Sequence, residues 1–188
     1  RRARAATLLT LALPGSAYLY QGEELGLPEV TDLPDDALQD PTWERSGRTE
    51  RGRDGCRVPL PWEGSEPPFG FGPDGTVPWL PVPAEWAGLT REAQREDPDS
   101  TLSMYTAALR ARRGFAALGD GALTWIDAPP GVLAFRREPG FACAINLSED
   151  EAVLALTGEL LLASGKVELR GGALVLPADT TAWLSIGY

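Results

Sequence analysis

Residues 16–26 read SAYLYQGEELG and residues 52–62 read GRDGCRVPLPW, and both stretches combine glycines with aromatic and charged residues. Residues 16–20 are almost wholly apolar or aromatic, which is typical of a strand covered on both faces in a parallel sheet. Before them, residues 2–13 are rich in alanine and leucine at spacings of three and four, and Pro14-Gly15 follows. We therefore predict a helix over 2–13, a turn, and a buried strand over 16–20.

Residues 21–98 form a segment too long for an ordinary connection between two elements. This segment holds most of the prolines and four of the six tryptophans, and disordered segments rarely carry so many aromatic residues. We predict an ordered functional loop that packs on a scaffold. Short helices are expected within 33–43 and 83–94.

The remainder of the chain changes from helical to strand patterning. Asp99 and Ser100 can cap a helix over 101–118, and Gly119-Asp120-Gly121 ends it. Short apolar runs bounded by Gly, Pro, Asp or Ser follow, as in an antiparallel β-sandwich. They are residues 123–126, 132–136, 141–146, 152–156, 160–163, 167–169, 173–176 and 181–186.

Composition excludes several classes of function. The formal charge of −10 would repel phosphate backbones and anionic lipid, so we expect neither nucleic-acid nor membrane partners. The chain has no histidine, which removes Ser-His-Asp and Cys-His catalysis and most zinc and haem sites. The cysteines, Cys56 and Cys143, form no CxxC pair, so we expect two free thiols in a reducing, cytoplasmic compartment and no metal or cofactor.

Two carboxylates and a tyrosine, Glu23, Glu24 and Tyr20, lie just past the expected strand. In an α/β barrel this is the end at which sites are built. The alternative is that the glutamates bond loop amides or cap the following turn. Adjacent carboxylates are poorly placed to flank one glycosidic bond, because a glycosidase holds its catalytic pair on opposite sides of the linkage, about 5 to 9 Å apart.

The second stretch combines Asp54, Arg57 and Trp62 in a loop that glycine and proline stiffen. An arginine fork can bond sugar hydroxyls while an indole covers the face of a pyranose ring. An internal Arg–Asp lock that only shapes the loop explains the same residues. The sequence leaves both interpretations open.

Residues 20–26 followed by residues 52–62 resemble the end of the catalytic barrel in glycoside hydrolase family 13 α-glucosidases and oligo-1,6-glucosidases. Those enzymes carry YQGEE(L/I)G at the last barrel strand and then an RD..R.PM.W loop. The chain departs from them at Ala17, where proline is frequent, and at Leu60, where methionine is frequent. The resemblance implies an α/β plus all-β fold: the last helix, strand, long loop and helix of a (β/α)8 TIM barrel over 1–119, then an antiparallel β-sandwich over 122–188.

The resemblance also implies a function for a longer parent protein. The parent would be a retaining α-glucosidase that removes terminal glucose from malto- or isomalto-oligosaccharides. Its catalytic aspartate, glutamate and aspartate would lie upstream of Arg1, so this chain has no catalytic residue and is expected to be inactive alone. Its partners would be the oligosaccharide substrate and the missing N-terminal barrel segment.

Within the site, the resemblance implies pocket-shaping or substrate-binding roles. Arg57 and Asp54 would shape the pocket or contact substrate, Trp62 would be a nearby platform, and Tyr20 and Glu23 would support the site from beneath. Three alternatives stay open: a transglycosylating relative of the sucrose isomerase or trehalose synthase type, a non-catalytic carbohydrate-binding module, and a barrel homologue that lost its carboxylates, as in amino-acid transporter heavy chains.

Overall fold

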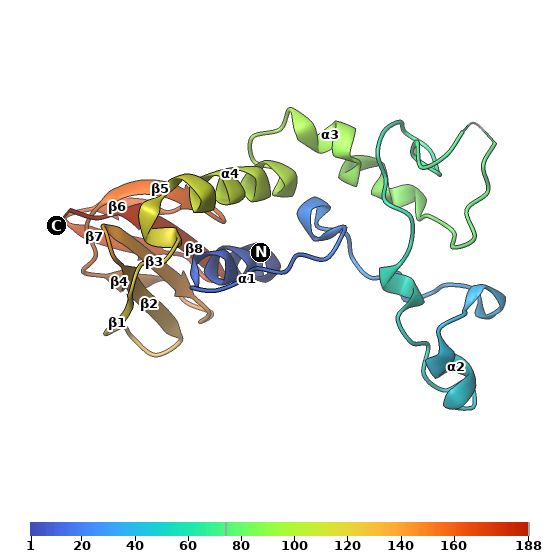
Figure 1. The fold of residues 1–188 in the computed structure, drawn as a ribbon, viewed down its shortest axis with the longest axis horizontal. Helices are drawn as coiled ribbons and strands as arrows, with labels where there is room; N and C mark the ends of the chain where they lie inside the picture. The colour runs from blue at the N-terminus through green and yellow to red at the C-terminus, as the bar shows by residue number, and fades with distance from the viewer. Residues whose placement is uncertain (74, 188) are drawn as a thin grey trace. The chain divides into compact units, whose positions relative to one another are not determined.

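The computed structural model describes residues 1–73 and 75–187 (Figure 1). The chain forms two compact units: Arg1–Tyr18 with Met104–Tyr188, and Leu19–Ser103. The contacts of this chain thus group its first helix and most of a later one with the strands. The division into 1–119 and 122–188 refers to a barrel that this chain alone does not form, and it stays a prediction.

Helix α1, Arg2–Ala12, confirms the helix predicted at the start of the chain. Its buried residues are Ala5, Leu8, Leu11 and Ala12, which lie on one face. Leu13 is already extended, with φ −70° and ψ 152°, because the ring of Pro14 disfavours helical backbone at the preceding residue.

The strand predicted over residues 16–20 is wrong for this chain, because no described strand pairs with this segment. Tyr18 is 89% exposed, and Leu19 and Tyr20 are also exposed. A strand needs backbone partners on a neighbouring strand, and an apolar sequence cannot supply them. The apolar pattern therefore predicts a covering that this chain does not itself provide.

Helix α4, Thr101–Gly114, confirms the later predicted helix, although the helical path breaks near its end. Ser100 caps α4, since its Oγ accepts a hydrogen bond from the amide of Ser103 at 3.1 Å. Phe115 is extended, and a separate 3₁₀ helix, η5, follows over Ala116–Leu118.

Within the described residues, each of the eight predicted runs overlaps a strand, and these strands form two antiparallel sheets. The five-stranded sheet has the order β1-β2-β3-β8-β5 and the three-stranded sheet has the order β4-β7-β6. The strands are β1 Leu123–Ile126, β2 Val132–Arg137, β3 Phe141–Asn146, β4 Ala152–Leu154, β5 Glu159–Ala163, β6 Glu168–Arg170, β7 Ala173–Leu176 and β8 Thr180–Ser185.

The central strands of the five-stranded sheet, β3 and β8, are buried on both faces, because successive side chains of a strand point to opposite sides. In β3, Phe141 and Cys143 pack in one cluster with Leu8 of α1 and Met104 of α4. The alternate residues, Ala142 and Ala144, pack in a second cluster whose members from the three-stranded sheet are Leu154, Leu174 and Leu176. The unit therefore has three layers: helices, the large sheet and the small sheet (Figure 1).

Side chains of β8 bind the backbone of α1. The Thr181 Oγ1 donates to the Ala5 carbonyl at 2.8 Å, and the Trp183 Nε1 donates to the Leu8 carbonyl at 3.0 Å. Both contacts are buried. The last strand of the chain is thereby joined to its first helix by polar as well as apolar contacts.

Two arginines satisfy backbone carbonyls at the ends of helical segments, where intrahelical partners are missing. Arg112 of α4 donates to the carbonyls of Leu11, Leu13 and Gly15. Arg137 of β2 is fully buried and donates to the carbonyls of Ala12, Leu118, Gly119 and Gly121.

The unit Leu19–Ser103 is ordered around a core of its own, as the tryptophan content predicts. The buried members of this core are Leu33, Leu38, Trp43, Val58, Phe69, Leu80, Val82 and Trp86. Short helices occur where they were expected, around 33–43 and 83–94. The helical segments are η1 Glu23–Leu25, η2 Asp35–Ala37, α2 Pro41–Arg45, η3 Asp54–Cys56, η4 Ala84–Leu89 and α3 Arg91–Arg95.

In the part of the chain that the structure describes, no helix has the length and apolar character needed to cross a bilayer.

Candidate functional site

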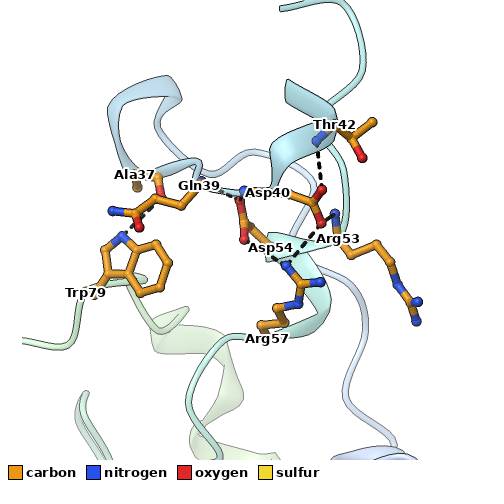
Figure 2. Close-up of polar contacts among 8 residues, drawn as sticks. All are labelled: Ala37, Gln39, Asp40, Thr42, Arg53, Asp54, Arg57 and Trp79. Carbon is orange, nitrogen blue, oxygen red and sulfur yellow. Dashed lines mark hydrogen bonds and ion pairs between the residues drawn. The ribbon is translucent and has the colours of Figure 1, made fainter. Parts of the chain in front are cut away.

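Asp40, Asp54 and Arg57 form a cluster at the base of the loop that carries the second sequence stretch (Figure 2). The Arg57 Nη1 lies 3.0 Å from the Asp40 Oδ2 and 3.3 Å from the Asp54 Oδ1. Both carboxylates are buried, whereas the Arg57 side chain is 46% exposed. We refer to these three residues as the aspartate–arginine cluster.

Asp54 uses its other oxygen to hold the preceding backbone. Its Oδ2 accepts hydrogen bonds from the amides of Gln39 at 2.7 Å and Asp40 at 2.8 Å. The side chain is 1% exposed. This geometry favours the loop-shaping role for Asp54 over a direct contact with a ligand.

Asp40 is a member of the cluster that sequence reasoning missed. Its Oδ1 accepts from the Thr42 amide at 2.9 Å and caps α2, which begins at Pro41. Its Oδ2 accepts from the Arg53 amide at 3.1 Å as well as from Arg57. The Asp-Pro pair is itself a helix-start signal, which could have indicated the cap but not the contact with Arg57.

Glycines allow the backbone to approach this cluster. A Cβ on Gly52 would lie 2.5 Å from the Asp40 Cβ, and Gly52 has a φ of +72°. A Cβ on Gly55 would lie 2.3 Å from the Val30 carbonyl oxygen. Gly52 is therefore a steric requirement of the cluster, and Gly55 is a steric requirement of the close approach to Val30.

The aspartate–arginine cluster should make the stability of the chain sensitive to acid. Hydrogen bonds from Thr42 and Arg53, with the charge of Arg57, lower the pKa of Asp40 from 3.8 to about 2. Because the pKa is lower in the folded chain, the stabilisation is present above pH 4 and is lost as the pH falls from about 4 to about 2. We expect Asp40→Asn to lower the urea midpoint of unfolding at pH 5. Near pH 2 the midpoints of the variant and the wild type should be equal. Tryptophan fluorescence measures both midpoints.

The control for this titration is Asp36→Asn, because Asp36 is an exposed carboxylate in the same unit. Its midpoint should follow the wild type at every pH. If the urea midpoints of Asp40→Asn and the wild type differed by the same amount from pH 5 to pH 2, the acid sensitivity would not arise from Asp40.

A cavity of about 200 Å³ lies within the same unit and contains two of the predicted site residues. Tyr20 and Glu23 line it, as do Cys56 and Val58 on either side of Arg57 in sequence. Its remaining lining residues are Gln21, Gly22, Leu27, Pro28, Glu29, Gly55, Leu60 and Trp86.

Arg57, Asp54 and Trp62 do not line this cavity. Trp62 is 45% exposed, and its backbone is held by the Phe69 carbonyl and the Glu92 amide. The structure therefore joins Arg57 to Asp54 and Tyr20 to Glu23, and it leaves Trp62 as an exposed indole on an anchored backbone. In residues 1–73 and 75–187 there is no group of three or more Asp, Glu or Cys side chains placed to hold a metal ion.

A family model described as the α-amylase catalytic domain matches residues 1–121. The chain belongs to the α-amylase family. A probable α-glucosidase of Rhizobium meliloti (strain 1021) is 35% identical over 151 residues, which are 79% of this chain and 27% of that protein. An oligo-1,6-glucosidase of Heyndrickxia coagulans is 26% identical over 79% of this chain and 30% of its own length.

Solved structures of other α-amylase-family enzymes superpose on almost the whole chain. An α-glucosyl transfer enzyme, XgtA, is 36% identical with a TM-score of 0.81, over 99% of this chain and 36% of that one. A trehalulose synthase, MutB of Pseudomonas mesoacidophila MX-45, has a TM-score of 0.81 at 20% identity over 99% of this chain and 38% of that one, which supports the fold alone. This α-amylase-family chain spans between about a quarter and two fifths of the length of these relatives.

The comparisons confirm the resemblance to α-glucosidases and oligo-1,6-glucosidases drawn from residues 20–26 and 52–62. The solved α-amylase-family relatives are TIM-barrel enzymes, and the antiparallel sheets of this chain agree with the C-terminal portion of such an enzyme.

Proposed function

We propose that this chain is the C-terminal part of a retaining α-glucosidase that hydrolyses terminal α-glucosidic bonds of malto- or isomalto-oligosaccharides. Residues 1–119 would supply the last helix, strand, long loop and helix of its barrel, and residues 122–188 its C-terminal β-sandwich. Two relatives, a probable α-glucosidase and an oligo-1,6-glucosidase, support this assignment.

The Arg57 guanidinium, which is only partly paired within the chain, provides the main support for the proposal. Two carboxylates hold its Nη1, and among the described residues its Nε and Nη2 have no hydrogen-bond partner. The side chain is half exposed, so the remaining N–H groups are available to sugar oxygens. Arg57 would thus contact substrate, while Asp54 shapes the loop beneath it.

The other predicted residues would complete the wall of the pocket. Tyr20 and Glu23 line the cavity of the same unit, and Trp62 offers an exposed indole suited to the face of a pyranose ring. The nucleophile and the acid/base carboxylate of a retaining mechanism would come from the segment upstream of Arg1. The partners of the chain would therefore be that segment and the oligosaccharide.

A purified preparation of the 188-residue chain should release no p-nitrophenol from p-nitrophenyl α-glucoside above the buffer rate. The same residues within the full-length parent polypeptide should release it, because only there would both carboxylates be present. Absorbance at equal molar protein, with circular dichroism to show that the chain is folded, makes the comparison. Hydrolysis by the chain alone would refute the assignment of catalysis to the upstream segment, and an inactive parent would refute the α-glucosidase assignment.

Transglycosylation is a second candidate, which the 36% identity to an α-glucosyl transfer enzyme over 99% of this chain favours. Products from maltose separate the two activities. A hydrolase accumulates glucose alone, whereas a transferase accumulates trisaccharides while glucose is released.

We infer a cytoplasmic location from the thiols, since Cys56 and Cys143 are both unpaired.

A further inference from the structure

The aspartate–arginine cluster contains more hydrogen bonds than are needed to shape the loop. Asp40 binds three separate groups through one carboxylate: the Thr42 amide, the Arg53 amide and the Arg57 guanidinium. We propose that Asp40 is a positioning residue that fixes the direction in which Arg57 presents its remaining N–H groups to the substrate. This inference rests on the proposed contact between Arg57 and sugar.

Asp40 itself cannot turn. Its Oδ1 is committed to the N-terminus of α2, and Gly52 packs so closely that an added Cβ would clash with its side chain. The residue is 7% exposed. Its Oδ2 is therefore aimed by the helix cap and by the Gly52 backbone.

The rigid shape of the arginine side chain extends this constraint from one nitrogen to the whole guanidinium. A guanidinium is planar and rigid, so two acceptors on one of its nitrogens restrict the whole plane. Asp40 and Asp54 approach the same Nη1 of Arg57 from two different segments of the loop. Figure 2 shows both carboxylates directed at this nitrogen. Among the described residues, no protein group pairs with the edge formed by Nε and Nη2.

The neighbouring arginines Arg48 and Arg51 pair with other side chains. Arg48 pairs with Glu44 at 2.9 Å, and Arg51 pairs with Asp35 at 2.8 Å and lies over the Trp43 ring. Arg53 contributes only its backbone amide, and its side chain points away from Arg57 in Figure 2. Among the described residues, Arg57 alone binds both buried carboxylates of the cluster.

The variant Asp40→Asn tests this role because it separates the helix cap from the positioning contact. Asparagine caps helices as well as aspartate does, so α2 should persist. The amide group then replaces the acceptor that faces Arg53 and Arg57 with a donor. The matched control is Asp35→Asn, which removes an exposed carboxylate that pairs with Arg51 in the same unit.

The first readout is spectroscopic and uses the 188-residue chain. In the wild type, nuclear magnetic resonance should show a coupling across the hydrogen bond between the Arg57 Nη1 and the Asp40 Cγ. Asp40→Asn should average the Arg57 side-chain signals to those of a mobile arginine, while Asp35→Asn leaves them unchanged. Absence of the coupling in the wild type, or unchanged Arg57 signals in Asp40→Asn, would overturn the proposal, and the wild-type measurement does not depend on how the variant folds.

The second readout is kinetic and uses the full-length parent polypeptide. A misplaced contact costs about 100-fold in rate, so Asp40→Asn should lower kcat/KM by about that factor, mostly in kcat, with the fold retained. Because Asp40 acts through Arg57, the double variant that carries Asp40→Asn and Arg57→Gln should lose no more kcat/KM than Arg57→Gln alone. Additive losses in the double variant would overturn the proposal. A wild-type parent without activity would refute the proposed function, and the spectroscopic readout would still decide the role of Asp40.

Discussion

Replacing Trp183 with alanine should lower the free energy of unfolding of the chain by about 3 to 5 kcal/mol, the usual cost of removing a large aromatic side chain from a core. Trp183 is fully buried, and its indole meets the Phe141 ring edge to face, with centroids 5.5 Å apart at 74°. Its Nε1 also satisfies the Leu8 carbonyl of α1. The variant would thus lose apolar contacts, an aromatic pair and a hydrogen bond to the first helix.

The matched control for Trp183 is Trp125→Ala in the same sheet. Trp125 also makes an edge-to-face contact, with Phe135 at 5.6 Å, but it is 60% exposed. Its removal should cost about 1 kcal/mol, close to the value of an aromatic pair alone. Urea titrations followed by far-ultraviolet circular dichroism give both values. Equal losses for the two variants would show that the helix–sheet core does not carry the stability assigned to it.

Replacing Arg137 with methionine should lower the free energy of unfolding by about 3 kcal/mol. The buried carbonyls lose hydrogen bonds from a charged donor, which contribute about 1.5 to 3 kcal/mol each. The loss is partly offset because methionine avoids the desolvation cost of a buried charge. Arg137 is fully buried, and its guanidinium binds carbonyls at the end of α1, in η5 and in the turn before β1. Burial lowers the pKa of Arg137, and the positive charge of Arg112 acts in the same direction.

Arg136→Met is the control for this substitution, because Arg136 is the exposed neighbour on the same strand. Its free energy of unfolding should stay within about 0.5 kcal/mol of that of the wild type, as for most surface changes. Thermal or urea unfolding of the purified variants measures the difference. If Arg137→Met matched Arg136→Met, the carbonyl contacts would have no role in joining the helical segments to the sheet.

The strands of the sandwich were the most predictable part of the fold. Runs such as 123–126, 141–146 and 173–176 coincide with β1, β3 and β7, because glycine, proline and polar residues bound each run. The strand predicted over 16–20 failed for the opposite reason. Its apolar pattern indicates burial, but burial of a strand depends on neighbouring strands, and no described strand pairs with it.

The association of α1 with the sheets could not be predicted from the sequence. The contacts of Ala5 with Thr181 and of Leu8 with Trp183 join residues at opposite ends of the chain. An apolar face shows that a helix will be covered, but it does not identify the partner. The helix was therefore expected to serve a barrel, whereas in this chain it packs on the sandwich.

The candidate site was predictable in residue type and less so in geometry. The sequence indicated Arg57 and Asp54 and left sugar binding and an internal lock as alternatives. The structure supports the lock at Asp54, which uses both oxygens on protein groups. The contact of Asp40 with Arg57 could not be predicted, because Asp40 lies 17 positions before Arg57 and the fold of the loop brings the two together.

The opposite environments of the two cysteines have a practical use in labelling chemistry. Cys143 lies in the core of the five-stranded sheet, and burial raises the pKa of its thiol, so reagents cannot reach it in the native state. Cys56 is exposed and lines the cavity, although partial burial and nearby Glu29 raise its pKa too. A maleimide dye applied at mildly alkaline pH would therefore attach at a single position, and its emission would report occupancy of the cavity without any engineered residue.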